Sequence, residues 1–298
     1  MKLDPKNAGR SEFYNLLTSA IAPRPICFAA TRSADGVLNV SPFSYFNVFS
    51  ANPPVVVFSP ARRGRNNTTK DTLNNLMEVK ECTVNIVNFS MVEQMSLAST
   101  EYPPGVSEFE KAGFTPVESE RISVPRVGES PVSFECVADD IIPLGDKGGA
   151  GNLVLARIVL AHVDNRYLDE DGQLDTTKLD LVARMGGNYY CRAKGDAIFE
   201  IPKPTGKLGI GIDRLPESVR MSEVLSGNNL GRLGTVERLP DPSEVAEMAE
   251  EAQIEAILEQ EGLTPAYQRS AIHQVAKHWL ENGETERALR GLLLADGL

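Results

Sequence analysis

Two neighbouring stretches of the sequence gather residue types that bind anions and flat polar rings. In one of them, residues 62–75 read RRGRNNTTKDTLNN and collect four basic side chains, threonine hydroxyls and two asparagine pairs. A helix is expected to begin near its end, and the free N–H groups and dipole of a helix start favour an anion. It is therefore a candidate phosphate site. A solvated loop whose Thr69 or Asp71 caps the helix explains the same residues, and both interpretations stay open.

The other stretch, residues 39–60, reads NVSPFSYFNVFSANPPVVVFSP. A buried strand has no need of Ser41, Ser44 and Asn47 near its end. Small hydroxyls, exposed backbone and aromatic rings suit the polar edge of a flat ring. A flat ring that carries a phosphate tail describes flavin mononucleotide (FMN). The two stretches together predict an FMN site, with the ring along SPFSYFN and the phosphate at RNNTTKDT.

Few other residues offer chemistry of their own. The sequence has no GxSxG, GxxxxGK[ST] or HExxH motif, and GIGID lacks the third glycine of a dinucleotide fingerprint. Of the three histidines, His162 lies in an apolar stretch typical of a structural role, while His273 and His278 are wrongly spaced to share a metal. Glu108 and Glu135 appear as isolated carboxylates. We therefore predict no catalytic side chain and no metal, and chemistry that comes from a cofactor.

Composition and charge narrow the function classes. The chain has 298 residues, 42% of them apolar and 24% charged, with a formal net charge of −11. An acidic protein of this kind is disfavoured as a binder of nucleic acid or of anionic membrane, since both need a basic face. No apolar run approaches a membrane span, and MKLDPKNAGR does not resemble a signal peptide, so a cytoplasmic location is expected. The four cysteines, without a CxxC pair, predict reduced thiols.

The elements that would position the site are mostly strands. Residues 1–204 contain short runs rich in Val, Ile and Phe, separated by turn residues such as Asp35-Gly36, which predicts a hairpin. Helices are expected over 69–81 and 90–100. Many short strands with little βαβ alternation favour a β-barrel over a doubly wound sheet. The expected strands are 25–33, 39–50, 54–60, 82–88, 130–144 and 153–164.

The residue composition changes after residue 204, from strand-forming runs to glycine-rich and then helix-forming sequence. We predict a C-terminal extension over 205–298, with a glycine-rich loop over 205–242 and helices over 243–298. Thr264-Pro265 is typical of a helix start. Residues 237–298 carry 13 Asp and Glu against 5 Lys and Arg, which indicates a solvated acidic helix face.

Several phrases now resemble a known family in their order along the chain. The chain is similar to the flavin reductase-like family, FMN-binding split barrels that include flavoredoxin-type proteins and the reductase components of two-component monooxygenases. The resemblance covers roughly residues 10–200. It rests on APRPICFAATRSADGVLNVSPFSYFNVFSANPPVVVFSP, KDTLNN, ECTVNIVN, YPPGVSEFEKAGFTP, PRVGESPVSFEC and RMGGNYY.

The resemblance implies a mainly β fold, a homodimeric split β-barrel with a few helices and FMN near the dimer interface. It implies that one segment contacts the flavin ring and another contacts the phosphate. Arg62 is a candidate partner of the phosphate or of the ribityl chain. Because Arg63 and Arg65 lie beside it in the sequence, that assignment stays open. The segment after PRP is implied to reach the flavin through Thr31, and the implied ring contacts are Ser41, Pro42, Phe43, Ser44 and Asn47. The implied phosphate contacts are Lys70, Asp71 and Thr72.

Two further phrases are implied to border the flavin. Residues 102–114, YPPGVSEFEKAGF, form either a lid over the nicotinamide or substrate, or an ordinary surface connection. Residues 184–192, RMGGNYYCR, are expected beside the site, with Gly186 and Gly187 allowing close backbone approach or only a turn.

The function implied is reduction of FMN by NADH or NADPH. The expected ligands are therefore a flavin and a nicotinamide nucleotide. The expected partner is a monooxygenase or another protein that accepts electrons. A flavoredoxin-like electron carrier that uses no nicotinamide is an alternative. Another is an FMN enzyme that acts on an organic substrate, with residues 205–298 closing the site. A non-enzymatic module with a recruiting acidic tail is a third. Three questions stay open: whether the donor is NADH or NADPH, whether FMN is a prosthetic group or a substrate, and whether FAD takes the place of FMN.

Overall fold

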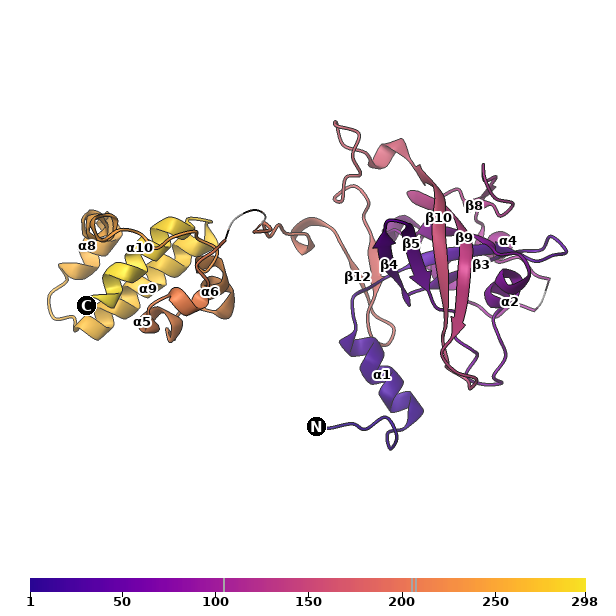
Figure 1. Cartoon of the computed structure of the whole chain (residues 1–298), viewed down its shortest axis with the longest axis horizontal. Helices are drawn as coiled ribbons and strands as arrows, with labels where there is room; N and C mark the ends of the chain where they lie inside the picture. The colour runs from indigo at the N-terminus through magenta and orange to yellow at the C-terminus, as the bar shows by residue number, and fades with distance from the viewer. Residues whose placement is uncertain (104, 205, 207) are drawn as a thin grey trace. The chain divides into compact units, whose positions relative to one another are not determined.

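A seven-stranded antiparallel sheet, with strand order β3-β2-β6-β9-β10-β5-β4, organises the first part of the chain (Figure 1). The computed structural model describes every residue but 104, 205 and 207. The chain divides into two units, Met1–Phe199 and Glu200–Leu298, close to the predicted boundary at residue 204. The strands are β2 (Cys27–Arg32), β3 (Leu38–Phe43), β4 (Phe46–Ala51), β5 (Pro54–Phe58), β6 (Glu81–Ile86), β9 (Val132–Pro143) and β10 (Asn152–Val163).

The connection between β3 and β4 closes the sheet. These two strands are its opposite edges, yet only Ser44 and Tyr45 separate them in sequence. Two residues span only a few ångströms, so the sheet must curl until its edges meet. The prediction of one strand over 39–50 is wrong at this point, because the chain leaves one edge here and starts the other. The remaining predicted strands are confirmed within a few residues, and Gly36, at φ +88°, turns the predicted hairpin.

Strand β2 shows how the sheet is packed on both faces. Its alternate residues enter different clusters, Phe28 and Ala30 in one, Cys27 and Ala29 in the other. A strand buried on both sides reads as a continuous apolar run, as CFAA does. Cys27, Cys82 and Cys136 are buried and Cys191 is exposed, and all four are free thiols, as predicted.

Helices and small sheets surround this barrel. The predicted helices are confirmed as α2 (Asp71–Glu78) and α3 (Val92–Leu97, after a 3₁₀ turn at Phe89–Met91). Helix α1 (Arg10–Ala20) was not predicted, and α4 (Glu108–Ala112) follows α3. Two small sheets complete the unit: β1 (Arg24–Pro25) with β11 (Val182–Arg184) and β12 (Tyr190–Arg192), and β7 (Pro116–Val117) with β8 (Arg126–Val127).

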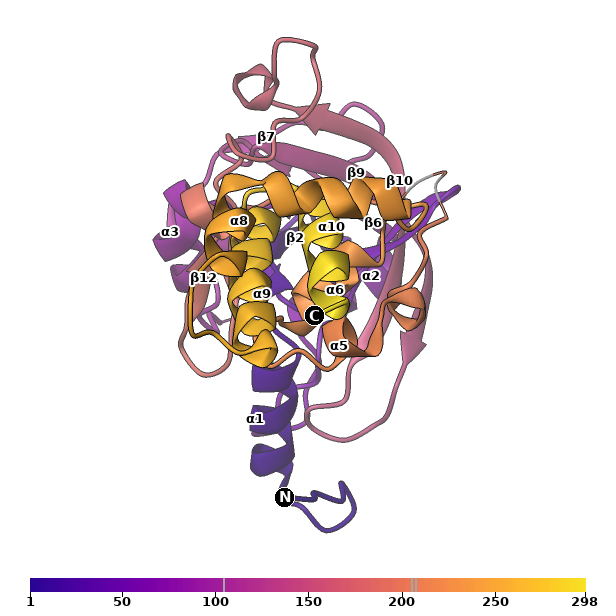
Figure 2. The ribbon, with the colours of Figure 1, turned by 90° about the vertical axis from the view of Figure 1, so that its left-hand side faces the viewer.

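The second unit is helical and has its own apolar core. Figures 1 and 2 show its two longest helices, α9 and α10, packed together, and Trp279 and Leu280 of α9 are buried among residues of this unit alone. Its helices are α5 (Glu217–Arg220), α6 (Gly227–Leu233), α7 (Pro242–Ala246), α8 (Ala252–Leu258), α9 (Pro265–Glu281) and α10 (Thr285–Asp296). Thr264 caps α9 through a bond from the Tyr267 N–H, so the predicted helix start is confirmed.

The prediction of a loop throughout 205–242 is wrong for α5 and α6. Ser226 and Asn229 form a capping box that starts α6 in spite of its glycines, and the buried Leu233 fixes the helix to the core. Residues 205 and 207 of the predicted loop lie outside the described residues. Within the described part of the chain, no helix combines the length and the apolar character needed to span a membrane.

Candidate cofactor-binding site

A pocket of about 220 Å³ brings together four of the residues predicted to bind FMN. Pro42, Phe43 and Ser44 at the end of β3 line it together with Lys70. The other walls come from α1, from Tyr45 and from the turn that follows β11, including Tyr14, Thr18, Arg24, Arg184, Met185 and Gly187. The β3–β4 link that closes the barrel is therefore also a wall of this pocket.

Arg24 fixes the walls of the pocket relative to one another. Its buried guanidinium donates to the carbonyl oxygens of Thr18 at 2.6 Å and Ile21 at 2.5 Å, and to that of Met185 at 3.1 Å. One side chain thus joins the end of α1 to the turn after β11. Arg24 was not predicted as a site residue. The sequence offers one signal for it, since it lies in the PRP phrase just before the buried strand β2.

Lys70 places a positive charge at the start of α2. Its ammonium lies 5.3 Å from the centre of the Phe43 ring, and the residue is the N-cap of the helix. Burial, followed by repulsion from Arg63, lowers the pKa of Lys70 below its ordinary value. The first N–H groups of a helix have no intrahelical acceptor, so the ammonium and the N–H groups of α2 can hold the same anion.

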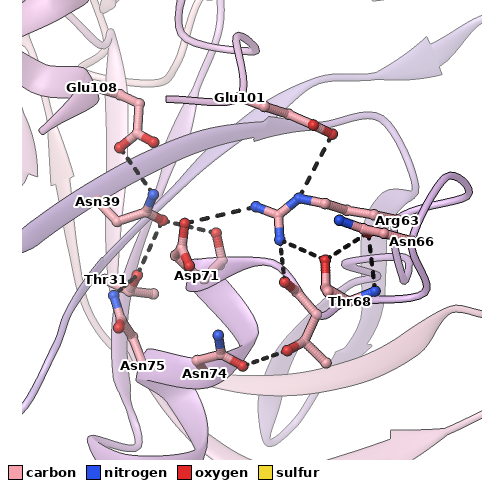
Figure 3. Close-up of polar contacts among 12 residues, drawn as sticks. Thr31, Asn39, Arg63, Asn66, Thr68, Asp71, Asn74, Asn75, Glu101 and Glu108 are labelled. Atoms are coloured by element: carbon pink, nitrogen blue, oxygen red, sulfur yellow. Dashed lines mark hydrogen bonds and ion pairs between the residues drawn. The ribbon is translucent and has the colours of Figure 1, made fainter. Parts of the chain in front are cut away.

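A buried polar network lies beneath this helix start (Figure 3). Thr72 Oγ1 donates to Asn39 Oδ1 at 2.9 Å, and Asn75 Nδ2 donates to Thr31 Oγ1 at 3.1 Å. Asn39 Nδ2 in turn donates to Glu108 Oε2 at 2.9 Å. The hydroxyls of Thr31 and Thr72 are thus occupied inside the protein, and their contact with a cofactor stays a prediction.

Glu108 is not the isolated carboxylate that its sequence context indicates. The same oxygen, Oε2, accepts from Asn39 Nδ2 and from the Val40 N–H at 3.3 Å, so the first residue of α4 is joined to β3. Burial raises the pKa of the Glu108 carboxyl, although its hydrogen bonds oppose the shift. Sequence reasoning could not find this pairing, because residues 39 and 108 are far apart along the chain.

The arginines of the candidate phosphate loop mostly hold the loop itself. Arg62 donates through Nε to Asn67 Oδ1 at 2.9 Å. Arg63 lies 3.7 Å from an Asp71 carboxylate oxygen and 3.6 Å from one of Glu101, and it donates to the Thr69 carbonyl (Figure 3). Of the basic residues in 62–70, Lys70 is the one that lines the pocket.

Ser41 and Asn47 lie on β3 and β4 but do not line the pocket. Ser41 is half-buried and faces Ala29 in the strand register. Asn47 is exposed and its Oδ1 accepts from the Val48 N–H at 2.8 Å. Their roles, like those of Arg62 and Asp71, stay predictions.

The two phrases expected to border the flavin differ in the structure. Arg184 and Gly187 line the pocket, so 184–192 lies beside it. Gly186 allows close approach to α1, because a Cβ there would clash with Ser19 Oγ, whereas Gly187, at φ +58°, forms a turn. In 102–114, Phe109, Ala112 and Phe114 are buried in the core, which favours a fixed connection over a lid; residue 104 lies outside the described residues.

Replacing Glu108 tests the network. Glu108→Ala leaves Asn39 Nδ2 and the Val40 N–H without an acceptor in a site where Glu108 is 6% exposed, so we expect a loss of about 2 to 4 kcal/mol in unfolding free energy. Glu108→Gln can keep both bonds through one oxygen and should be much milder. Chemical denaturation measures both, with the exposed Glu110→Ala on the same helix as control.

The same pair of variants has an expected pH dependence. Because the pKa of Glu108 is raised in the folded state, the folded protein binds the proton more tightly than the unfolded chain. This contribution to stability is present at low pH and is lost as the pH rises through the raised value. Glu108→Gln should remove this component of the stability profile; an unchanged profile would contradict the assignment.

The fold agrees with the comparison to known proteins. Residues 19–180, more than half of the chain, match the flavin reductase like domain, and the chain belongs to this family. A relative of unassigned function from Halalkalibacterium halodurans is 41% identical over 207 residues, 69% of this chain and 97% of the relative.

Solved structures confirm the predicted split barrel. Nitrilotriacetate monooxygenase component B from Bacillus cereus is 36% identical with a TM-score of 0.63, over 67% of this chain and 98% of that one. The 2-nitrobenzoate 2-nitroreductase of Pseudomonas fluorescens is 28% identical with a TM-score of 0.59, over 68% and 96% of the two chains. A split-barrel protein from Shewanella frigidimarina is 26% identical with a TM-score of 0.57, over 68% and 99%.

Proposed function

We propose that the chain binds FMN in the 220 Å³ pocket and reduces it with NADH or NADPH. The observation that carries this proposal is the position of Lys70, which lines one pocket with Pro42, Phe43 and Ser44 and stands at the start of α2. An anion site and a polar, aromatic wall therefore face the same space. Membership of the flavin reductase-like family supports a flavin as the ligand with these two properties.

Each part of the site has a proposed task. Lys70 and the first N–H groups of α2 would hold the phosphate, and the backbone and hydroxyl of residues 42–44 would meet the polar edge of the ring. Thr31 and Thr72 support this surface from the network below it. Ser41, Asn47, Arg62 and Asp71 are proposed contacts to parts of the cofactor outside the pocket.

FMN bound here would supply the acceptor for a hydride from the nicotinamide. The protein needs no side-chain base for such a transfer, and its work is to hold two flat rings in contact and to exclude water between them. Arg24 serves this work by fixing α1 and the Met185 turn as two walls of the pocket.

The proposal is tested by anaerobic absorption spectroscopy of the full chain with one equivalent of FMN. We expect a bound flavin spectrum that bleaches within seconds on addition of NADH or NADPH. The donor that bleaches it faster is the preferred one. A flavin that binds but that neither nucleotide bleaches would overturn nicotinamide use and favour an electron carrier. Failure to bind FMN would overturn the proposed site itself.

A second candidate is reduction of an organic substrate by the bound flavin. It is favoured by the similarity to a protein described as a 2-nitrobenzoate 2-nitroreductase. The two candidates differ in one measurement: oxidation of reduced, protein-bound FMN by a nitroaromatic compound under anaerobic conditions. The similarity to a monooxygenase component B supports instead a protein acceptor for the electrons.

We also propose a homodimer that completes the site. Small-molecule pockets commonly measure about 300 to 1,000 Å³, so 220 Å³ offers room for only part of a flavin nucleotide. Large apolar side chains are exposed along α1 and the residue after it, and along β4; α1 itself lines the pocket, and so does Tyr45, just before β4. They include Tyr14, Leu17, Ile21, Val48 and Phe49.

Phe49→Asp is expected to convert the dimer to a monomer, because it places a charge in an apolar interface. Sedimentation velocity measures the mass, and flavin fluorescence measures the affinity for FMN, which should fall with dissociation. Leu144→Asp, also at an exposed apolar residue, is the control and should stay dimeric. A wild-type protein that sediments as a monomer would contradict the proposal.

A further inference from the structure

His273 is a buried histidine in the helical second unit. It lies on α9 and is 3% exposed. Its Nδ1 lies 2.8 Å from Ser222 Oγ, and Ser222 belongs to the turn between α5 and α6. This one contact therefore joins the turn to the longest helix of the unit.

The hydrogen bonds of Ser222 fix the protonation of the imidazole. A hydroxyl has two acceptor lone pairs and one proton to donate. Ser222 Oγ accepts from the N–H groups of Val224 at 3.2 Å and Leu225 at 3.3 Å, which uses both lone pairs. Its proton is therefore donated to His273 Nδ1. The imidazole is neutral, and it carries its own proton on Nε2.

A charged His273 does not fit this arrangement. Its Nε2 is already buried without a hydrogen-bond partner in the described part of the chain. Protonation would add a second N–H, on Nδ1, aimed at a serine oxygen whose lone pairs are in use. The bond from Ser222, or the bonds that Ser222 accepts from the turn, would then break. Buried donors without acceptors are costly, and buried charges more so.

The charged groups around His273 do not offset this cost. Arg269, one turn earlier on α9, repels a positive charge there, whereas Asp296 of α10 favours one. Asp296 is exposed, however, and already accepts from Ser218 Oγ. Glu223, in the turn itself, is also exposed. Burial, followed by repulsion from Arg269, holds the pKa of His273 below its ordinary value.

The turn that Ser222 fixes is the start of α6. Leu225 of this turn is buried in the apolar core of the unit, and Ser226 after it caps α6. Helix α6 contacts α9, the helix that carries His273. Loss of the Ser222–His273 hydrogen bond would therefore loosen the attachment of α6 to α9.

We propose that the Ser222–His273 contact is a pH-sensitive device, which holds the start of α6 on α9 while His273 is neutral and opens in mild acid. It belongs to the second unit alone, and it does not depend on the function proposed for the first.

The buried histidine pair of the first unit has the opposite character. His162 Nε2 lies 2.7 Å from Oε1 of Glu135, a buried carboxylate that is not isolated, as its sequence context indicated. Glu135 also accepts from the N–H groups of Glu120 at 2.8 Å and Arg121 at 2.7 Å. A carboxylate remains an acceptor when the imidazole is charged. Mild acid should therefore act on the second unit first.

The lowered pKa of His273 gives the direction of the effect. The unfolded chain takes up a proton at this histidine as the pH falls through about 6.5, whereas the folded unit resists the proton until a lower pH. The contribution to stability is complete above the unfolded value. It is lost as the pH falls from there through the folded value.

The single tryptophan of the chain makes the second unit separately measurable. Trp279 is buried in the same core, so its fluorescence follows unfolding of this unit in the full-length protein. Chemical denaturation at pH 7 and at pH 5 gives the unfolding equilibrium constant. The comparison variant is His273→Asn, whose amide oxygen can accept from Ser222 and takes up no proton in this range.

We expect the constant to rise between pH 7 and pH 5 by about 5- to 25-fold more in the wild type than in His273→Asn, the upper limit being set by an unfolded pKa of about 6.5. His278→Gln, at an exposed histidine of the same helix, is the control and should follow the wild type. An equal pH dependence of the wild type and His273→Asn would overturn the proposal.

A second measurement decides the case if His273→Asn does not fold. The NMR signals of the His273 ring in the wild-type protein should titrate with a pKa below about 6.5. Titration at or above that value would show that the folded unit accepts the charge, and would equally overturn the proposal. Neither measurement uses flavin, so failure of the protein to bind FMN leaves both results intact.

Discussion

Lys70→Met is expected to weaken FMN binding by about 10- to 100-fold. The substitution keeps an unbranched side chain over the Phe43 ring but removes the charge at the start of α2. A hydrogen bond to a charged group contributes about 1.5 to 3 kcal/mol, and each 1.4 kcal/mol is a factor of about ten in affinity. Quenching of flavin fluorescence on binding measures the dissociation constant.

The pH dependence of the same affinity separates charge from shape. The lowered pKa of Lys70 means that the free wild-type protein loses this charge at a lower alkaline pH than an ordinary lysine would. FMN affinity should therefore fall earlier as the pH rises, and Lys70→Met should lack that decline. Lys80→Met, at an exposed lysine of the same unit, is the control. Equal affinity of Lys70→Met and the wild type would remove Lys70 from the site.

Trp279→Ala is expected to destabilise the second unit by about 3 to 5 kcal/mol, the usual cost of removing a large buried side chain. Trp279 is 2% exposed, Arg287 lies 4.4 Å from its ring, and Gly291 packs so closely that a Cβ would lie 3.0 Å from it. Trp279 is buried in the apolar core of the second unit, so the proposed flavin pocket of the first unit should be unaffected.

Two measurements separate the units in this experiment. Circular dichroism follows the helical second unit, and FMN release follows the first. We expect the helical transition to move to lower temperature while FMN affinity stays unchanged. Tyr267→Ala, at an exposed position of α9, controls for substitution in the same helix. A parallel loss of FMN affinity would contradict the independence of the two units.

The strands could be predicted from local sequence patterns, because the residues of each strand themselves favour extended structure. The β-branched run VVV of β5 and the apolar run CFAA of β2 are signals of this kind. The phrases SPFS and TKDT likewise marked Pro42, Phe43, Ser44 and Lys70, which the structure brings to one pocket.

Contacts between residues far apart in the sequence could not be predicted in this way. Glu108 and Glu135 looked isolated because their partners lie elsewhere in the chain, Asn39 for one and His162 for the other. Helix α1 was missed because its start carries no capping side chain: its N-cap is Gly9, which makes no side-chain hydrogen bond. The break after Phe43 was missed because strand-forming residues continue across it; only the meeting of two sheet edges requires it.

The two-residue link between β3 and β4 limits where the chain can be engineered. Ser44 and Tyr45 join opposite edges of the sheet and line the pocket, so the same short link closes the barrel and shapes the pocket. The hairpin at Asp35-Gly36 is exposed and joins neighbouring strands. An epitope tag or an inserted domain therefore belongs at residues 35–36, whereas residues added at 44–45 would lengthen the link that holds the two edges together and would change the wall of the pocket.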